Sequence, residues 1–106
     1  MFFLMRCFHH PNKDLDRDEH RSAHRAWVQS GGEGRAVVLI GSGLLDQAGN
    51  AIGNFGILQT RTLQDAKAFA EGDPFNAVGI VATIEITPLP DSFQADRISD
   101  PMTARH

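Results

Sequence analysis

The chain contains little cysteine, no excess of positive charge and no long apolar segment, and each of these absences excludes a class of protein. Its 106 residues include one cysteine, Cys7, which has no partner for a disulfide, so we expect a reducing, cytoplasmic setting. Lysine and arginine total 10 against 13 aspartate and glutamate residues, which leaves no broad basic surface for nucleic-acid phosphates. The sequence therefore predicts a protein without a nucleic-acid partner.

Apolar residues gather in short runs only. No run approaches the roughly 20 apolar residues of a membrane-spanning helix. The apolar start of the chain is interrupted at Arg6, too early for the hydrophobic region of a signal peptide. We expect a soluble protein of one domain with no membrane partner.

Hydrophobic spacing predicts six main elements. These are strands over residues 2–8, 35–43, 55–61 and 78–87, and helices over residues 14–30 and 63–72. Capping-box spacings, Asp16 with Glu19 and Thr62 with Asp65, mark the two helix starts, and a long turn is expected between the second and third strands. This order predicts an α+β fold of the ferredoxin-like βαββαβ type, an antiparallel sheet with two helices on one face.

The last residues differ in composition from the rest. After Pro90 the sequence becomes polar, so we predict a domain over residues 1–88 and a loosely held tail over residues 89–106.

Two strands are apolar on both faces. Residues 36–40 and 2–5 are uninterrupted apolar runs, whereas a sheet covered on one side should alternate apolar and polar residues. No further helix is predicted to cover the second face, and contiguous apolar patches are seldom left exposed. We therefore predict a homodimer whose outer sheet faces cover each other.

The first helix carries histidines on the face predicted to pack inward. That face follows helical spacing through His20, Ala23, His24, Trp27 and Val28, with Arg21 and Arg25 on its flanks. We interpret Trp27 as packing that also forms a pocket wall. The histidines could hold a metal only with a third ligand, for which His9 or Asp73 could serve, and we predict no metal site.

The stretch AEGDPF, residues 70–75, places an aspartate between two helices. Gly72 ends the second helix, and Asp73 is expected to cap a short following helix with Pro74 in its first position. A capping carboxylate keeps lone pairs for a second partner. A carboxylate that meets His24 would orient its ring and make it a proton acceptor near neutral pH.

The sequence resembles the YCII-related family of small dimeric α/β-barrel proteins. The resemblance rests on RSAH at residues 21–24, EGRAVVLIG at 33–41 and AFAEGDPFNAVGI at 68–80. It implies the fold and dimer given above, and it matches His24 and Asp73 to the family's active-site pair and Arg21 to its arginine. Members often have Gly-Pro after the second strand, whereas GSGLL stands here, so the lip of the pocket and the substrate are expected to differ.

Two functions are consistent with these residues and with the resemblance. The first is a cofactor-independent lyase, dehydrochlorinase or isomerase acting on a small organic substrate, with His24 and Asp73 catalytic and Arg6 or Arg21 holding a substrate carboxylate or enolate. Trp27 and Phe75 complete the expected substrate-binding set. The alternative is a dimeric small-molecule-binding or accessory module without catalysis, because the fold hosts both.

Overall fold

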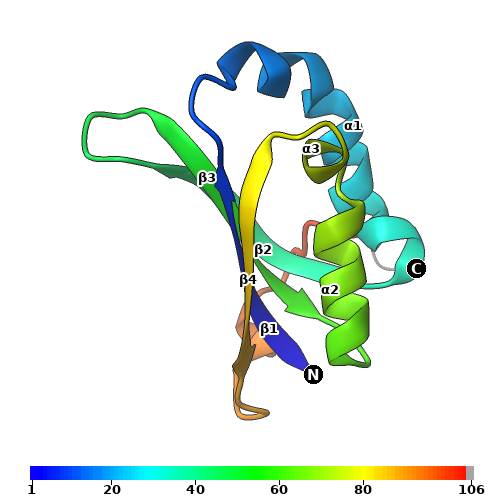
Figure 1. Cartoon of the computed structure of the whole chain (residues 1–106). Helices are drawn as coiled ribbons and strands as arrows, with labels where there is room; N and C mark the ends of the chain where they lie inside the picture. Colours follow the sequence, from blue (N-terminus) through cyan, green and yellow to red (C-terminus); the bar gives the residue numbers. More distant parts are fainter. Residues whose placement is uncertain (105–106) are drawn as a thin grey trace.

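An antiparallel sheet with strand order β2-β3-β1-β4 carries α1, α2 and α3 on one face in the computed structural model, which describes residues 1–104 (Figure 1). The elements in chain order are β1 (Phe2–His9), α1 (Asp14–Gly34), β2 (Val37–Leu45), β3 (Ala51–Gln59), α2 (Leu63–Gly72), α3 (Pro74–Ala77), β4 (Val81–Leu89) and the short 3-10 helix η1 (Ala95–Arg97). This order confirms the ferredoxin-like βαββαβ prediction.

The core lies between the sheet and α2. Side chains alternate along a strand, so Phe3, Met5 and Cys7 of β1 all point towards the helices and are buried. They meet Ala66 and Phe69, which lie on one face of α2. Alternation along β1 and helical spacing along α2 thus place apolar side chains on facing surfaces, which form one continuous apolar layer.

The regular part of α1 ends at Ser30, where glycine predicted its end. Gly31 and Gly32 have φ values of 64° and 62°, in the left-handed region that glycine adopts without strain. A side chain at Gly32 would also meet the rings of Trp27 and Phe69 at 2.8 Å. The helix begins at Asp14, as predicted, but the predicted capping box of Asp16 and Glu19 is wrong: no side chain caps this end, and the Asp14 carboxylate pairs with Arg17.

The turn between β2 and β3 is shorter than predicted. Asp46 accepts hydrogen bonds from the backbone N–H groups of Ala48 and Asn50, each at 2.9 Å, and so closes a tight turn. β3 therefore starts at Ala51, and Gly53 lies inside the strand, where a side chain would stand 2.2 Å from the Cys7 carbonyl oxygen.

The last strand lies later in the chain than predicted. Gly79, with φ 81°, follows α3, and β4 runs from Val81 to Leu89 and includes Pro88. Proline is tolerated there because β4 is an edge strand.

The polar tail is anchored near its end at Thr103, which contradicts the prediction of a loosely held segment, and residues 105–106 of that predicted tail lie outside the described part of the chain. Thr103 is only 6% exposed. Its hydroxyl accepts from Val38 N–H at 2.7 Å and donates to the Val28 carbonyl at 2.8 Å. The tail thus joins β2 to α1, although nothing in its polar composition indicated a buried contact.

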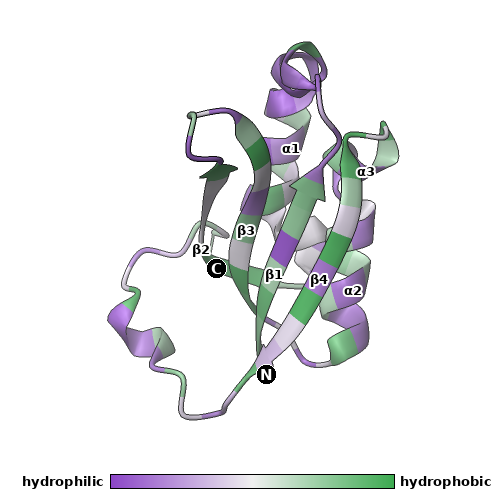
Figure 2. Ribbon diagram, turned by 60° about the vertical axis from the view of Figure 1, so that its left-hand side comes forward, coloured by the Kyte–Doolittle hydropathy of each residue, from purple (hydrophilic) through white to green (hydrophobic). Residues whose placement is uncertain are grey.

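The sheet face turned away from the helices, which is towards the viewer in Figure 2, also carries apolar side chains, because Leu4 and Phe8 alternate with the inward-facing residues of β1. The register pairs Leu4 with Ile57 and Arg6 with Phe55 on this face. Arg6 forms an ion pair with Glu85 of β4 at 3.3 Å. Near one end of the face, the tail residue Phe93 packs on Phe2, with ring centres 5.3 Å apart. Within residues 1–104 no helix is long and apolar enough to cross a membrane.

Candidate active site

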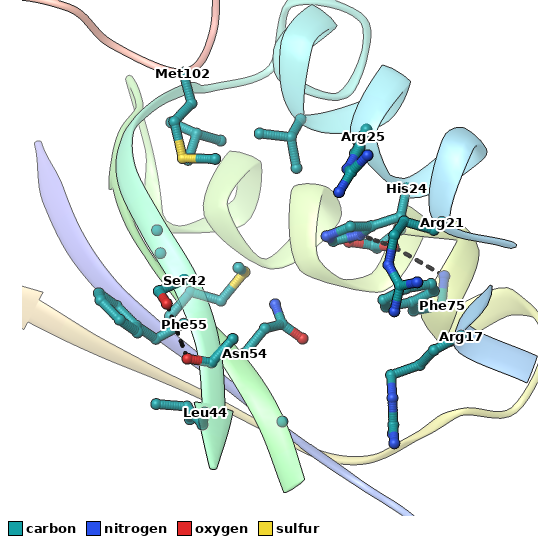
Figure 3. Close-up of a pocket in the computed structure, with 18 of the residues that line it drawn as sticks. Arg17, Arg21, His24, Arg25, Ser42, Leu44, Asn54, Phe55, Phe75 and Met102 are labelled. Carbon is teal, nitrogen blue, oxygen red and sulfur yellow. Dashed lines mark hydrogen bonds and ion pairs between the residues drawn. The ribbon is translucent and has the colours of Figure 1, made fainter. Parts of the chain in front are cut away.

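A cavity of about 510 Å³ lies between α1 and the β2–β3 hairpin (Figure 3). The pairing register of β2 and β3 explains why this cavity is open. Gly41 stands opposite Gly56, and Gly43 opposite Asn54, on the strand positions that face α1. Three of these four positions lack side chains, so nothing from these strand positions fills the space beneath α1. The cavity is lined on its apolar side by Met5, Val28, Val38, Phe69 and Met102.

His24 and Asp73 meet at the wall of this cavity. The His24 Nδ1 atom lies 2.9 and 2.8 Å from the two carboxylate oxygens of Asp73. Asp73, which is 6% exposed, also accepts from the Phe75 backbone N–H at 2.8 Å and so caps α3, as predicted. The predicted contact between the two side chains is therefore confirmed.

The contact determines which nitrogen of His24 is free. An ionised carboxylate can only accept, so a neutral His24 carries its proton on Nδ1 and presents a lone pair at Nε2. Among residues 1–104, no protein group hydrogen-bonds Nε2. His24 lines the cavity, and the arrangement is that of an oriented proton acceptor.

Phe75 holds the His24 ring from one side. The two rings are stacked, with centres 4.2 Å apart and planes 4° from parallel. His9 contacts the same phenyl ring edge-on, at 5.8 Å and 87°. With a hydrogen-bonded edge and a stacked face, His24 has little freedom to rotate.

A second polar group lies beside this pair. Arg17, only 7% exposed, donates to His9 Nδ1 at 3.2 Å, and His9 Nε2 lies 2.8 Å from Asn54 Oδ1. Burial is the main cause that lowers the pKa of His9 below its ordinary 6.5, and the Arg17 charge lowers it further. The neutral imidazole thus accepts from Arg17 and donates to Asn54.

Cys7 lies under the site but takes no part in it. Burial, with a smaller contribution from the Asp73 charge, raises the pKa of its thiol to about 12. The thiol therefore remains protonated at neutral pH and is a poor nucleophile.

The structure separates the predicted substrate-binding residues. Phe75 and Arg21 line the cavity. Arg6 does not, because it lies on the opposite face of the sheet in the ion pair with Glu85. Trp27 does not line the cavity either. Its Nε1–H donates to the Phe69 carbonyl at 3.0 Å, and its ring packs between α1 and α2.

The inward face of α1 also differs from the prediction. Ala23 is exposed and His20 is half-buried outside the cavity, whereas Arg25 lines the cavity although it is itself exposed. The helix face that lines the cavity runs through Arg17, Arg21 and His24. Within residues 1–104, no three histidine, cysteine or acidic side chains are grouped as metal ligands.

Sequence reasoning missed Arg17, Asn54 and Met102 as site residues. Arg17 precedes His24 by seven residues, a helical spacing that could have indicated a shared face. Asn54 could be assigned only once the strand register was known, and Met102 belongs to the tail.

Comparison of the chain and its fold with known proteins shows the family to which the protein belongs. No curated protein matches the chain. A similar solved structure is 5-chloro-2-hydroxyhydroquinone dehydrochlorinase from Burkholderia phenoliruptrix AC1100, in complex with 2,5-dihydroxybenzoquinone. It is 21% identical, with a TM-score of 0.74 over 85% of this chain and 94% of that one, and it shares the fold. Residues 1–90 match the YCII-related domain, and the chain therefore belongs to the YCII-related family.

Proposed function

We propose that the protein catalyses proton transfer on a small organic substrate without a cofactor, as a lyase, dehydrochlorinase or isomerase. His24 is the general base or acid, and Asp73 orients it. The observation that carries this proposal is the contact of His24 Nδ1 with both Asp73 oxygens, which leaves Nε2 free at a cavity.

The chemistry needs no group beyond these residues. Nε2 removes a proton from a carbon next to a carbonyl or an activated ring position. The electron pair of the broken C–H bond then forms a double bond and expels chloride, or it is protonated again at another atom. The Asp73 carboxylate stabilises the imidazolium that forms in between. The dehydrochlorinase of similar fold, whose complex holds a benzoquinone, supports a substrate of this size.

The proposal includes a homodimer. Leu4 and Ile57 stand opposite each other on the outer sheet face, and both are only partly buried in the single chain. Phe8 adds to the same face, and the tail covers only the end near Phe2. A second copy of the chain would remove this apolar surface from water.

Turnover assays on wild type and three variants test the catalytic proposal. The panel consists of chlorinated hydroxy-aromatics, followed by chloride release, and small lactones, followed by NMR of deuterium uptake from solvent. Where a substrate is found, His24→Ala is expected to lower kcat by about 10² to 10⁴. Asp73→Asn should also lower it, while its amide oxygen still caps α3.

His20→Ala is the matched control, since it removes a histidine of the same helix that does not line the cavity. Its kcat should equal that of the wild type. A wild-type protein that binds panel compounds without turning any of them over would instead favour the non-catalytic binding module. A His24→Ala variant that retains full turnover would also contradict the proposal.

A further inference from the structure

Three arginines line one side of the cavity. Arg17, Arg21 and Arg25 follow each other at intervals of four residues on α1, and Figure 3 shows all three beside His24. Among the described residues that line the cavity, Asp73 is the only acidic one, and it is engaged by His24. The cavity is therefore positive although the chain has a net charge of −3.

The arginines differ in what already binds them. Arg17 is held by Asp14 and His9, and Arg21 is paired with Asp18 on the exposed side of the helix. Arg25 has no acidic partner within residues 1–104. A guanidinium carries five N–H donors, so Arg21 retains donors beyond its ion pair, and all those of Arg25 are available.

The opposite side of the cavity supplies a neutral donor. Arg17 cannot accept a hydrogen bond, so His9 Nδ1 accepts and His9 Nε2–H donates to Asn54 Oδ1. This contact fixes the side-chain amide of Asn54 with its oxygen towards His9, which leaves its NH₂ group for a ligand. Figure 3 shows Asn54 across the cavity from the arginines and His24.

We propose that the cavity binds a planar aromatic carboxylate, with its carboxylate on Arg21 and Arg25 and a ring oxygen on the amide NH₂ of Asn54. Arginine forks match carboxylates in two parallel hydrogen bonds. The glycines at positions 41, 43 and 56 leave a flat strand surface on which a ring can lie. The volume, about 510 Å³, exceeds that of a single ring and leaves room for ring substituents.

This inference rests on the proposed function in one respect, namely that His24 is the reacting group. Arg21 lies one helical turn before both His24 and Arg25, and Figure 3 shows both arginines beside His24, so a carboxylate held by the two arginines would place the ring near His24. His9 is a positioning residue here, because it acts through Asn54.

Calorimetric titration with benzoate and with benzamide, which has the same shape without the charge, tests the inference. Wild-type protein is expected to bind benzoate at least about tenfold more tightly than benzamide at low salt, and the difference should shrink as salt is added. Equal affinities for the two probes would overturn the proposal.

Variants locate the binding. Arg21→Met and Arg25→Met should each weaken benzoate binding by about tenfold and leave benzamide binding unchanged. Arg97→Met removes the same charge from η1, outside the cavity, and should leave both affinities unchanged. Equal losses in all three variants would show general charge attraction and overturn the assignment of the carboxylate site.

A filling variant tests the cavity itself. A side chain at Gly43 would find its nearest neighbour, the Gly53 carbonyl oxygen, at 3.9 Å, so Gly43→Val can fold and occupy the space. It should abolish binding of both probes, and unchanged benzoate binding would contradict the proposed location.

His24→Ala separates this inference from the proposed function. It should keep benzoate binding within about twofold of the wild type, because the carboxylate contacts are on the arginines. Charge-selective benzoate binding in a protein that turns nothing over supports the inference and contradicts the catalytic proposal. Turnover of uncharged compounds alone, without benzoate binding, supports the catalytic proposal and contradicts the inference of a carboxylate site.

Discussion

The protonation state and tautomer of His9 are determined by the groups that contact its ring and not by its place in the sequence. A guanidinium on one nitrogen and an amide oxygen on the other suit only the neutral ring with its proton on Nε2. Protonation would put a second positive charge beside buried Arg17, with His24 nearby, and only the Asn54 contact and the Asp73 charge favour it. The folded state therefore resists a proton that the unfolded chain takes up readily.

Stability should consequently depend on pH through His9. Because its pKa is lowered from 6.5 on folding, the unfolded chain binds more protons at pH values below about 6.5. The free energy of unfolding should therefore be highest above pH 6.5 and fall as the pH drops towards the folded-state pKa. Urea unfolding at a series of pH values measures this dependence.

His9→Gln provides the control, since glutamine can still donate to Asn54 and does not titrate. Its unfolding free energy should change less with pH between about 5 and 7 than that of the wild type. An identical slope in the two proteins would show that other groups cause the effect.

Among the secondary-structure elements, α1 depends on the tail, which supplies hydrogen-bond donors to carbonyl groups at the end of the helix. The last carbonyl groups of a helix lack partners within it. Here the Val28 carbonyl accepts from the Thr103 hydroxyl and the Gln29 carbonyl accepts from Ala104 N–H at 3.2 Å. Thr103 also satisfies both backbone groups of Val38 on the edge strand β2. One residue thereby joins a helix end to a sheet edge.

Replacing Thr103 should therefore be costly despite its position in a polar tail. Thr103→Val keeps the shape but leaves the Val38 N–H and the Val28 carbonyl without partners, at an expected loss of about 2 to 4 kcal/mol in the free energy of unfolding. Thr103→Ser keeps the hydroxyl and should lose only about 1 kcal/mol, for the methyl group. Urea titration compares them, and a valine variant as stable as the serine variant would show that the hydroxyl contacts do not stabilise the fold.

Across the entire protein, the two faces of the sheet have different roles. The helix-facing side holds the core and the cavity, whereas the outer side carries partly buried apolar residues around the Arg6–Glu85 ion pair. The dimer proposed for this outer face remains a prediction. It would leave the cavity, which lies on the other side, intact in each chain.

Sedimentation of a charge variant tests the dimer. The wild type is expected to sediment as a dimer at micromolar concentration, and Leu4→Glu as a monomer, because it would bury an unpaired carboxylate at the interface. Leu15→Glu is the matched control on α1, where Leu15 is 85% exposed, and should remain dimeric. A monomeric wild type with undiminished stability would contradict the prediction.

Local rules were sufficient for the order of elements and for the position of each member of the central pair within its own element. Glycine at residues 31 and 32 ended α1, and Asp73 before Pro74 capped α3, because these preferences depend on backbone conformation within a few residues. Helical spacing likewise placed His24 on a face directed at the sheet. The family resemblance then related His24 to Asp73, 49 residues away.

The remaining features depend on contacts between distant segments, which no local pattern encodes. Arg6 and Met5 are neighbours in sequence, yet strand alternation puts them on opposite faces, and only the register shows which face holds the cavity. Asn54 enters the site because it stands opposite Gly43, and Thr103 is buried because it lies against Val38, 65 residues earlier. Sequence patterns thus established which elements form and in what order, whereas the pairing of strands and the packing of the tail determined which side chains share a space.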